Sequence, residues 1–192
     1  AVNKTLRMIL FLMGFSTLCV LVLAGAQLAY ERAAAVFNVR LYQAILELYG
    51  IGDREGGTEG IFAEHFTEKR VGNRSYWTST TVEPGSVVFT AEGSGLWSRI
   101  ELLVAVEADG ESLYGLRVLS QAETPGLGGR IAERGFQERF RGVAVRPAVR
   151  VVKFATAPTD VDAIAGASRT SAAVGVIINQ AIRDYDRATG RE

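Results

Sequence analysis

The sequence has few of the residues that bind metals or form disulfides. Among its 192 residues there are one cysteine, Cys19, and one histidine, His65. A lone cysteine forms no disulfide within the chain, and without a cluster of Cys and His there are no soft ligands for zinc, haem or an iron–sulfur centre. Metal chemistry that depends on such ligands is therefore excluded.

An excess of charge of either sign is also absent. The chain has 21 Lys and Arg residues against 21 Asp and Glu residues, which gives a formal net charge of zero. Proteins that neutralise nucleic-acid phosphates usually carry a strong basic bias, so we expect no nucleic-acid partner. The basic cluster within residues 130–153 is interpreted as a solvated or partner-facing surface.

A long apolar run is present near the N-terminus. Residues 8–30 contain no charged side chain, and a helix of that length spans roughly 35 Å, enough for a bilayer core. A cleaved signal peptide is the alternative, because basic residues precede the run and residues 24–26 resemble a cleavage site. The run continues past that site, which favours a retained anchor. The positive-inside rule then places residues 1–7 in the cytoplasm and residues 31 onward outside.

A stalk and a linker are expected after the predicted span. Apolar residues recur at three- and four-residue spacing over residues 33–48 and are followed by Gly50, a pattern typical of an amphipathic helix. Residues 50–60 are rich in glycine and polar side chains, which indicates a linker. We therefore expect a helical stalk and linker over residues 31–60 and an exported domain over residues 61–192.

The exported region is expected to be an α+β domain, an antiparallel sheet with packed helices. Runs of β-branched and aromatic residues predict strands, and Asp109-Gly110 between two of these runs predicts a hairpin. Apolar periodicity predicts a final helix that includes Val174 and Tyr185. The predicted strands lie at residues 76–82, 87–90, 100–106 and 113–119, with an extended piece at 149–155 and short helices at 61–70 and 131–140.

The first motif suited to chemistry is the glycine-rich segment over residues 123–129, directly after the last of these strands. Its Pro125-Gly126 pair suits a type II turn, and its glycines let backbone amides approach an anion or a flat ring. The alternative, which this segment taken alone favours, is an ordinary turn between a strand and a helix.

The second motif lies just before the final helix, over residues 162–171. Small residues at 165–167 precede hydroxyl side chains at a helix N-terminus, where free amides and the helix dipole favour an anion such as phosphate. The alternative is that Ser168, Thr170 or Ser171 only caps the helix.

Together these segments resemble a known family. The run Glu-Thr-Pro-Gly-Leu-Gly at residues 123–128, followed by Asp-x-x-x-Gly-Ala-Ser at residues 162–168, is similar to a particular FMN-binding domain. That domain is found in the C subunit of the Na+-translocating NADH:quinone oxidoreductase and in the G subunit of the Rnf complex. Residues 93–98, Gly-Ser-Gly-Leu-Trp-Ser, also resemble it.

In that family FMN is joined through its phosphate to a hydroxyl residue, usually threonine, and a separate flavin transferase installs it from FAD. By position, the resemblance implies that Ser168 carries the FMN and that Asp162 leads the motif recognised by the transferase. Thr170 is a second acceptor, ranked below Ser168, and noncovalent FMN is the alternative to attachment. Ala165 stands where the family usually has serine or threonine, and Ser168 where it usually has threonine.

The resemblance also implies which residues contact the cofactor. Amides near residues 165–167 would offset the phosphate charge, and Lys153 or Arg169 would neutralise it. The first motif would approach the ring or the ribityl chain, with additional apolar contacts from neighbouring residues. The expected cofactor-binding residues are Leu96, Trp97, Glu123, Thr124, Gly126, Leu127, Gly128, Lys153, Ala165, Gly166, Ala167, Ser168 and Thr170.

The function implied is that of an electron-transfer flavoprotein subunit in an ion-translocating membrane redox complex of the Rnf or Na+-translocating type. Such a chain would lie in the cell inner membrane, beside other membrane subunits, with its C-terminal domain on the periplasmic side. It would not oxidise NADH alone, because no Gly-x-Gly-x-x-Gly fingerprint follows a strand. Two other functions stay open: a membrane-anchored binding or sensory module for another anionic ligand and, ranked last, a serine hydrolase that uses Ser168.

Overall fold

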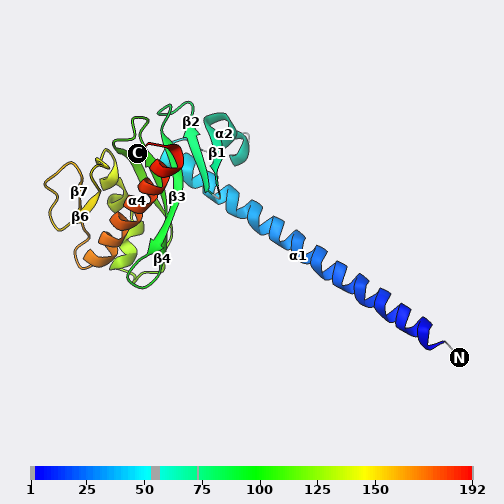
Figure 1. The fold of residues 1–192 in the computed structure, drawn as a ribbon. Helices are drawn as coiled ribbons and strands as arrows, with labels where there is room; N and C mark the ends of the chain where they lie inside the picture. Colours follow the sequence, from blue (N-terminus) through cyan, green and yellow to red (C-terminus); the bar gives the residue numbers. More distant parts are fainter. Residues whose placement is uncertain (1–2, 53–56, 73, 192) are drawn as a thin grey trace. The chain divides into compact units, whose positions relative to one another are not determined.

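The computed structural model describes residues 3–52, 57–72 and 74–191 (Figure 1). Residues 53–56 of the predicted linker therefore lie outside the described residues. The chain divides into two compact units, residues 1–41 and 42–192.

From Lys4 onward the first unit is helical and belongs to α1 (Lys4–Leu48). The stretch Leu6–Leu48 contains a window with a mean hydropathy of 2.4 and no buried residue, and it is long and apolar enough to cross a bilayer. Because no proline precedes Pro84, nothing interrupts the backbone hydrogen bonds of this region. The predicted span and stalk consequently form one continuous helix.

The second unit is built on a five-stranded antiparallel sheet whose strands follow one another in chain order. The strands are β1 (Phe66–Val71), β2 (Arg74–Ser79), β3 (Val87–Ser94), β4 (Arg99–Val106) and β5 (Leu113–Ser120). β4 is buried along most of its length, since both faces of the sheet are covered. The turn at Asp109-Gly110, with Gly110 at φ 79°, lies in the connection between β4 and β5, so the predicted hairpin is confirmed.

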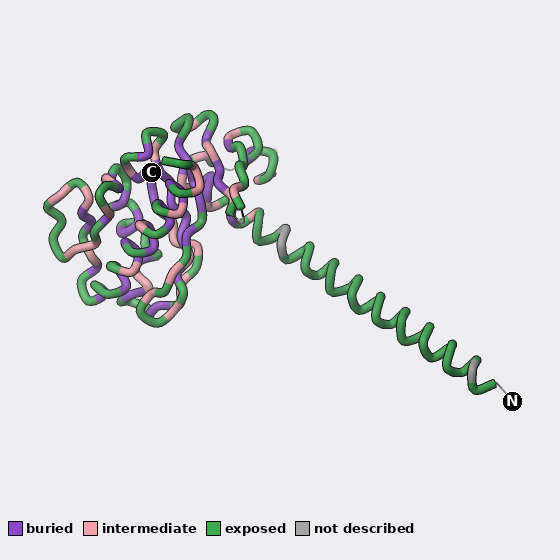
Figure 2. Tube along the Cα trace, in the orientation of Figure 1, coloured by how far each residue is buried: buried purple, intermediate pink, exposed green. Residues whose placement is uncertain are grey.

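One face of the sheet is covered by the long C-terminal helix α4 (Ser168–Thr189). Its apolar residues recur on one side and pack against β3 and β4. Gly93 of β3 permits a close approach, because a Cβ there would lie only 2.6 Å from Ile177 Cγ1. Buried residues accordingly follow the sheet and the inner side of α4 (Figure 2).

Aromatic residues fill the opposite face of the sheet. The Tyr49 ring stacks on Tyr114 of β5 with centroids 4.6 Å apart, and its hydroxyl forms a 2.9 Å hydrogen bond with Ser86 Oγ. From α2 (Thr58–His65), the Phe62 ring meets the edge of Trp77 of β2. The residues that connect α1 to the sheet therefore pack against the sheet face that α4 leaves open.

Shorter elements complete the second unit. After β5 come η1 (Gly128–Ala132), α3 (Arg134–Gln137) and η2 (Glu138–Phe140). β6 (Arg150–Val152) and β7 (Asp160–Asp162) pair in parallel, apart from the main sheet. β7 is followed directly by the turn that precedes α4.

The α+β prediction is confirmed, although two predicted helices are wrong in detail. α2 ends at His65, and the second half of the helix predicted over residues 61–70 is the edge strand β1. Most of β1 is exposed, so its sequence carries no alternating apolar pattern, and pairing with β2 decides its conformation. The helix predicted over residues 131–140 is broken because Glu133 is extended, at φ −69° and ψ 138°.

The compact second unit begins at residue 42, whereas the sequence indicated a domain start at residue 61. The reason is the burial of Ile45, Leu46 and Tyr49, which are at most 6% exposed. The end of the predicted stalk is thus part of the folded domain.

Candidate functional site

The first motif forms a tight turn shortly after β5. The Leu127 N–H donates to the Thr124 carbonyl oxygen at 3.2 Å, and Gly126, third in the turn, has φ 75°. Proline in the second position and a left-handed glycine in the third are features of a type II turn. The structure therefore contains the turn that Pro125-Gly126 predicts.

A second turn precedes α4. The Ala167 N–H donates to the Ile164 carbonyl oxygen at 2.9 Å, and Gly166 has φ 81°, a conformation that other residues rarely adopt. A Cβ at Gly166 would lie 3.3 Å from Leu127 Cδ2. Two motifs that are far apart in the sequence are therefore in contact in the fold.

The first turn of α4 has no side-chain cap. Ala167 is the N-cap residue, and no side chain forms a capping hydrogen bond. Thr170 Oγ1 donates to Glu123 Oε2 at 2.8 Å, and Ser171 Oγ accepts the Ile164 N–H at 3.1 Å. The interpretation of these hydroxyls as helix caps is therefore wrong. Uncapped amides and the helix dipole at this point favour an anion.

The hydroxyl side chains of this turn differ in their access to solvent. Thr170 is 1% exposed and Ser171 is 0% exposed, and both hydroxyls have partners inside the protein. Ser168 is exposed and lines a surface cavity. Among the three, Ser168 is thus the hydroxyl that a molecule from solvent can reach.

Glu123 connects the two motifs from a position that is only 4% exposed. Its Oε1 accepts the N–H groups of Trp97 and Ser98, both at 2.9 Å, and the Ser98 hydroxyl at 3.1 Å. Its Oε2 accepts the Thr170 hydroxyl. Burial raises the pKa of this carboxyl, but the hydrogen bonds outweigh burial and hold the pKa below its ordinary value. Glu123 is therefore ionised at neutral pH.

A surface cavity of about 330 Å³ lies where these elements meet. Its lining includes three large apolar side chains that are exposed to solvent: Leu96 (38% exposed), Trp97 (75%) and Leu127 (48%). Exposed apolar groups that gather around a cavity commonly mark a binding site. Arg169 adds a positive charge. The lining residues are Leu96, Trp97, Glu123, Thr124, Leu127, Gly128, Gly166, Ala167, Ser168, Arg169 and Thr170.

Most of the expected cofactor-binding residues line this cavity, and three do not. Gly126 and Ala165 lie in the two turns without being part of the lining. Lys153 lies beyond the end of β6, with Nζ 5.1 Å from the centre of the Phe154 ring. Of the two cations considered for the phosphate, Arg169 is the one at the cavity.

Ser98 contributes to the site although sequence reasoning assigned it no specific role. It donates to Glu123 through its backbone and its side chain, and its Oγ also accepts the Ala122 N–H at 2.9 Å. The only signal was its place in the Gly-Leu-Trp-Ser run, since its partners are distant in the sequence.

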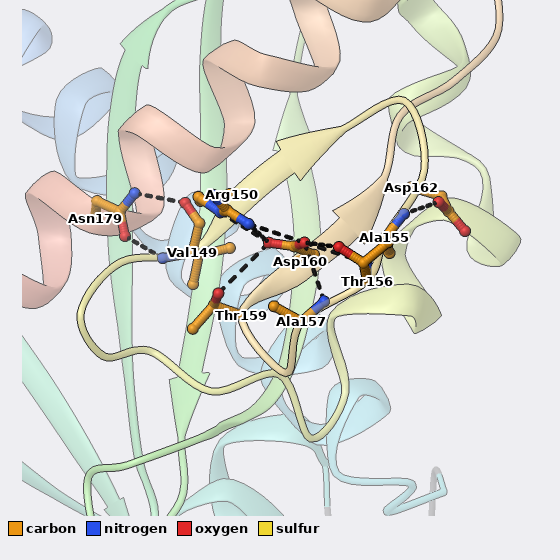
Figure 3. A network of polar contacts seen from close by, with 9 residues as sticks. All are labelled: Val149, Arg150, Ala155, Thr156, Ala157, Thr159, Asp160, Asp162 and Asn179. Carbon is orange, nitrogen blue, oxygen red and sulfur yellow. Dashed lines mark hydrogen bonds and ion pairs between the residues drawn. The ribbon is translucent and has the colours of Figure 1, made fainter.

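Asp162 lies outside the cavity lining, beside a second network of polar contacts (Figure 3). Its Oδ1 accepts the Ala155 N–H at 2.7 Å. Asp160 pairs with Arg150 at 2.8 Å and accepts the N–H groups of Thr156 and Ala157 at 3.2 and 3.1 Å. The two carboxylates hold the loop between β6 and β7. A role for Asp162 in recognition by a transferase stays a prediction.

Comparison with known proteins adds independent evidence. Residues 95–183 match the family model described as the FMN-binding domain. Over 104 residues the chain is 36% identical to the C subunit of the Na(+)-translocating NADH-quinone reductase of Vibrio anguillarum, a match that covers 50% of this chain and 41% of the relative. The corresponding protein of Neisseria meningitidis is 37% identical over 97 residues, with 47% and 38% covered. The matches thus span about two fifths of the length of these relatives.

Solved structures share the fold. The crystal structure of Shewanella oneidensis NqrC aligns with a TM-score of 0.64 at 20% identity and covers 77% of this chain and 96% of that one. The C subunit of the Na(+)-translocating NADH-quinone reductase from Parabacteroides distasonis gives a TM-score of 0.66 at 23% identity, with 77% and 89% covered. Residues 95–183, which hold both turns, Glu123 and Ser168, are thus similar to the FMN-binding domain that the two motifs indicated.

Proposed function

We propose that this chain is an FMN-binding electron-transfer subunit of a membrane-bound NADH–quinone reductase complex of the Na+-translocating type. The observation that carries the proposal is the cavity in which exposed Ser168 lies at the uncapped start of α4 beside exposed apolar side chains. Bound FMN would supply one- and two-electron transfer, which the side chains of this protein do not perform. The named relatives support the Na+-translocating type over the Rnf type.

The residues at the cavity fit the two ends of an FMN molecule. A phosphate needs N–H donors and positive charge, which the first turn of α4 and Arg169 provide. A flat ring needs apolar surface, which Trp97 and Leu127 provide while remaining accessible. Gly166, which also lines the cavity, contributes backbone that carries no side chain of its own. The lining therefore suits a ligand with one anionic and one aromatic end.

The cofactor is attached to Ser168 through a phosphoester in this proposal. Ser168 Oγ forms a bond to the phosphorus of the FMN half of FAD, the phosphoanhydride bond breaks, AMP leaves, and the hydroxyl proton passes to solvent. No oxidant or reductant is consumed. A flavin transferase catalyses this step, and the segment that begins at Asp162 is its recognition sequence. The exposure of Ser168, in contrast to Thr170, supports this choice of acceptor.

The remaining part of the proposal concerns location. α1 anchors the chain in the inner membrane, and the domain from residue 42 onward lies on the periplasmic side, next to other membrane subunits of the complex. The apolar window within Leu6–Leu48 supports the anchor. Lys4 and Arg7 on the N-terminal side of the apolar run support the orientation.

The test is to produce the full chain together with a flavin transferase and to examine it after denaturation. We expect yellow protein, in-gel flavin fluorescence that survives denaturation, and an intact mass increased by one FMN phosphoester. Ser168→Ala should lose the covalent signal, whereas Ser168→Thr, which keeps a hydroxyl at this position, should retain it.

The outcomes separate the parts of the proposal. Colour that disappears on denaturation would contradict attachment but not FMN binding. Colourless protein with the mass of the bare chain would contradict FMN binding and leave an anchored module for another anionic ligand. Persistent fluorescence in Ser168→Ala would move the acceptor to another residue.

A further inference from the structure

We infer that Glu123 is a positioning residue of the site, whose carboxylate ties the loop at residues 95–98 to the first turn of α4 and leaves Ser168 as the reachable hydroxyl. The inference rests on the proposed function in one respect, the identity of the ligand. It differs from the sequence-based expectation, in which Glu123 contacts the cofactor directly.

The hydrogen bonds of Glu123 are directed into the protein. Oε1 receives three donors from Trp97 and Ser98, and Oε2 receives the hydroxyl of Thr170. These donors lie 26, 25 and 47 positions away in the sequence, on two different segments. A carboxylate whose oxygens are occupied in this way has little capacity left for a ligand.

Two glycines also leave the space that the Glu123 carboxylate occupies. A Cβ at Gly95 would lie 2.6 Å from Glu123 Oε1, and a Cβ at Gly128 would lie 3.0 Å from Oε2. The carboxylate is therefore held between two glycines whose missing side chains make its position possible. This packing lets a buried charged group lie between two loops and connect them.

The hydrogen bond between Glu123 and Thr170 affects which hydroxyl is available to carry the flavin. Thr170 and Ser168 both carry hydroxyls in the first turn of α4, but Thr170 donates to Glu123 and is 1% exposed. Ser168 is exposed at the cavity. By holding Thr170 inward, Glu123 fixes the rotation of this turn and keeps Ser168 outward, on the same cavity as Trp97.

Asp160 provides a matched control. It is also a buried carboxylate that accepts backbone N–H groups, from Thr156 and Ala157, and its residue is 8% exposed. It is absent from the cavity lining. Replacing either carboxylate by its amide keeps the shape of the side chain and removes the charge.

The experiment compares Glu123→Ala, Glu123→Gln and Asp160→Asn in the full chain. The first measurement needs no flavin: amide hydrogen exchange at residues 97 and 98. We expect exchange to accelerate at least about tenfold in Glu123→Ala, because both amides lose their acceptor, and to stay near wild type in Asp160→Asn. Glu123→Gln should restore most of the protection, since its amide oxygen can accept the same N–H groups.

The second measurement is the visible circular dichroism of the transferase-treated protein, expressed per bound flavin. The signal reports how the ring is held, so it should fall by at least about half in Glu123→Ala, recover in Glu123→Gln and remain unchanged in Asp160→Asn. Peptide mapping should also show flavin on Thr170 in part of the Glu123→Ala protein.

Two results would overturn the inference. One is unchanged exchange at residues 97 and 98 in Glu123→Ala. The other is a per-flavin signal that changes equally in Glu123→Ala and Asp160→Asn, which would indicate general destabilisation. If wild-type protein takes up no flavin, the proposed function fails, whereas the exchange data still decide the role of Glu123.

Discussion

Two buried carboxylates, Glu123 and Asp160, accept similar hydrogen bonds, but their partners lie at different distances along the chain. Both accept several N–H groups, and in both the effect of burial, which raises the pKa, is outweighed by hydrogen bonds that lower it. The Asp160 partners lie within ten positions along the chain, so this carboxylate closes one loop. Glu123 joins segments up to 47 positions away. The same kind of group can therefore shape a loop locally or assemble a site from distant segments.

The two carboxylates also differ in the charge of their partners. Asp160 pairs with Arg150, whose side chain is 59% exposed. Within the described residues Glu123 accepts hydrogen bonds from neutral donors and has no ion-pair partner. Its negative charge therefore persists at the cavity, where Arg169 is the cation in the lining.

The largest effect on stability should come from replacing Gly95, the glycine beside Glu123. Gly95→Ala would place a methyl group 2.6 Å from Glu123 Oε1 and 2.7 Å from Ile100 Cδ1. We expect a loss of about 1–3 kcal/mol in the free energy of unfolding, together with reduced flavin dichroism. Urea unfolding of the full chain in detergent measures the first quantity.

Gly135→Ala is the control for that substitution. A Cβ at Gly135 meets no atom within 4 Å and the residue lies in α3, so we expect stability to change by less than about 1 kcal/mol. If Gly95→Ala lowered the free energy of unfolding no more than Gly135→Ala does, close packing around Glu123 would not contribute to stability.

A smaller effect is expected in the dependence of stability on pH. Because both folded pKa values are lowered, each carboxylate contributes stability that is present above its unfolded pKa and lost as pH falls through the folded pKa. The loss should lie below about pH 4, where carboxyl groups become protonated. Urea midpoints measured between pH 7 and pH 3 should fall less steeply in Glu123→Gln and in Asp160→Asn than in wild type. Equal slopes in all three proteins would contradict the lowered pKa values.

The smallest expected effect is a difference in how salt changes the destabilisation caused by replacing each carboxylate. Screening weakens an ion pair that is open to solvent, so the destabilisation caused by Asp160→Asn should shrink between low and high sodium chloride. The destabilisation caused by Glu123→Gln should change less, since its partners are neutral. Parallel urea titrations at the two salt concentrations would show the difference, and identical salt responses would remove this distinction.

Much of the fold follows from local patterns. Asp109-Gly110 predicts the hairpin, Pro125-Gly126 predicts the turn, and the periodicity of residues 174–185 predicts α4, because each signal acts within a few residues. β1 was missed because its conformation depends on pairing with β2 rather than on its own side chains. Local signals identify elements best where tertiary contacts do not override them.

In the candidate site, too, some features were predictable from the sequence and others were not. The resemblance located both motifs, and the fold brings most of the expected residues to one cavity. The hydrogen bonds of Glu123 could not be predicted, because its donors lie on distant segments and leave no mark in the spacing of the motif. The capping interpretation failed for the same reason, since Thr170 donates to a residue 47 positions away.

The proposal that Ser168 carries FMN has its sharpest test in tandem mass spectrometry of a proteolytic digest of the transferase-treated full chain. We expect fragment ions that place the FMN mass on Ser168. Placement of that mass on Thr170 or on any other residue of the wild-type chain would contradict the proposal, as would a digest in which the peptide containing Ser168 is entirely unmodified.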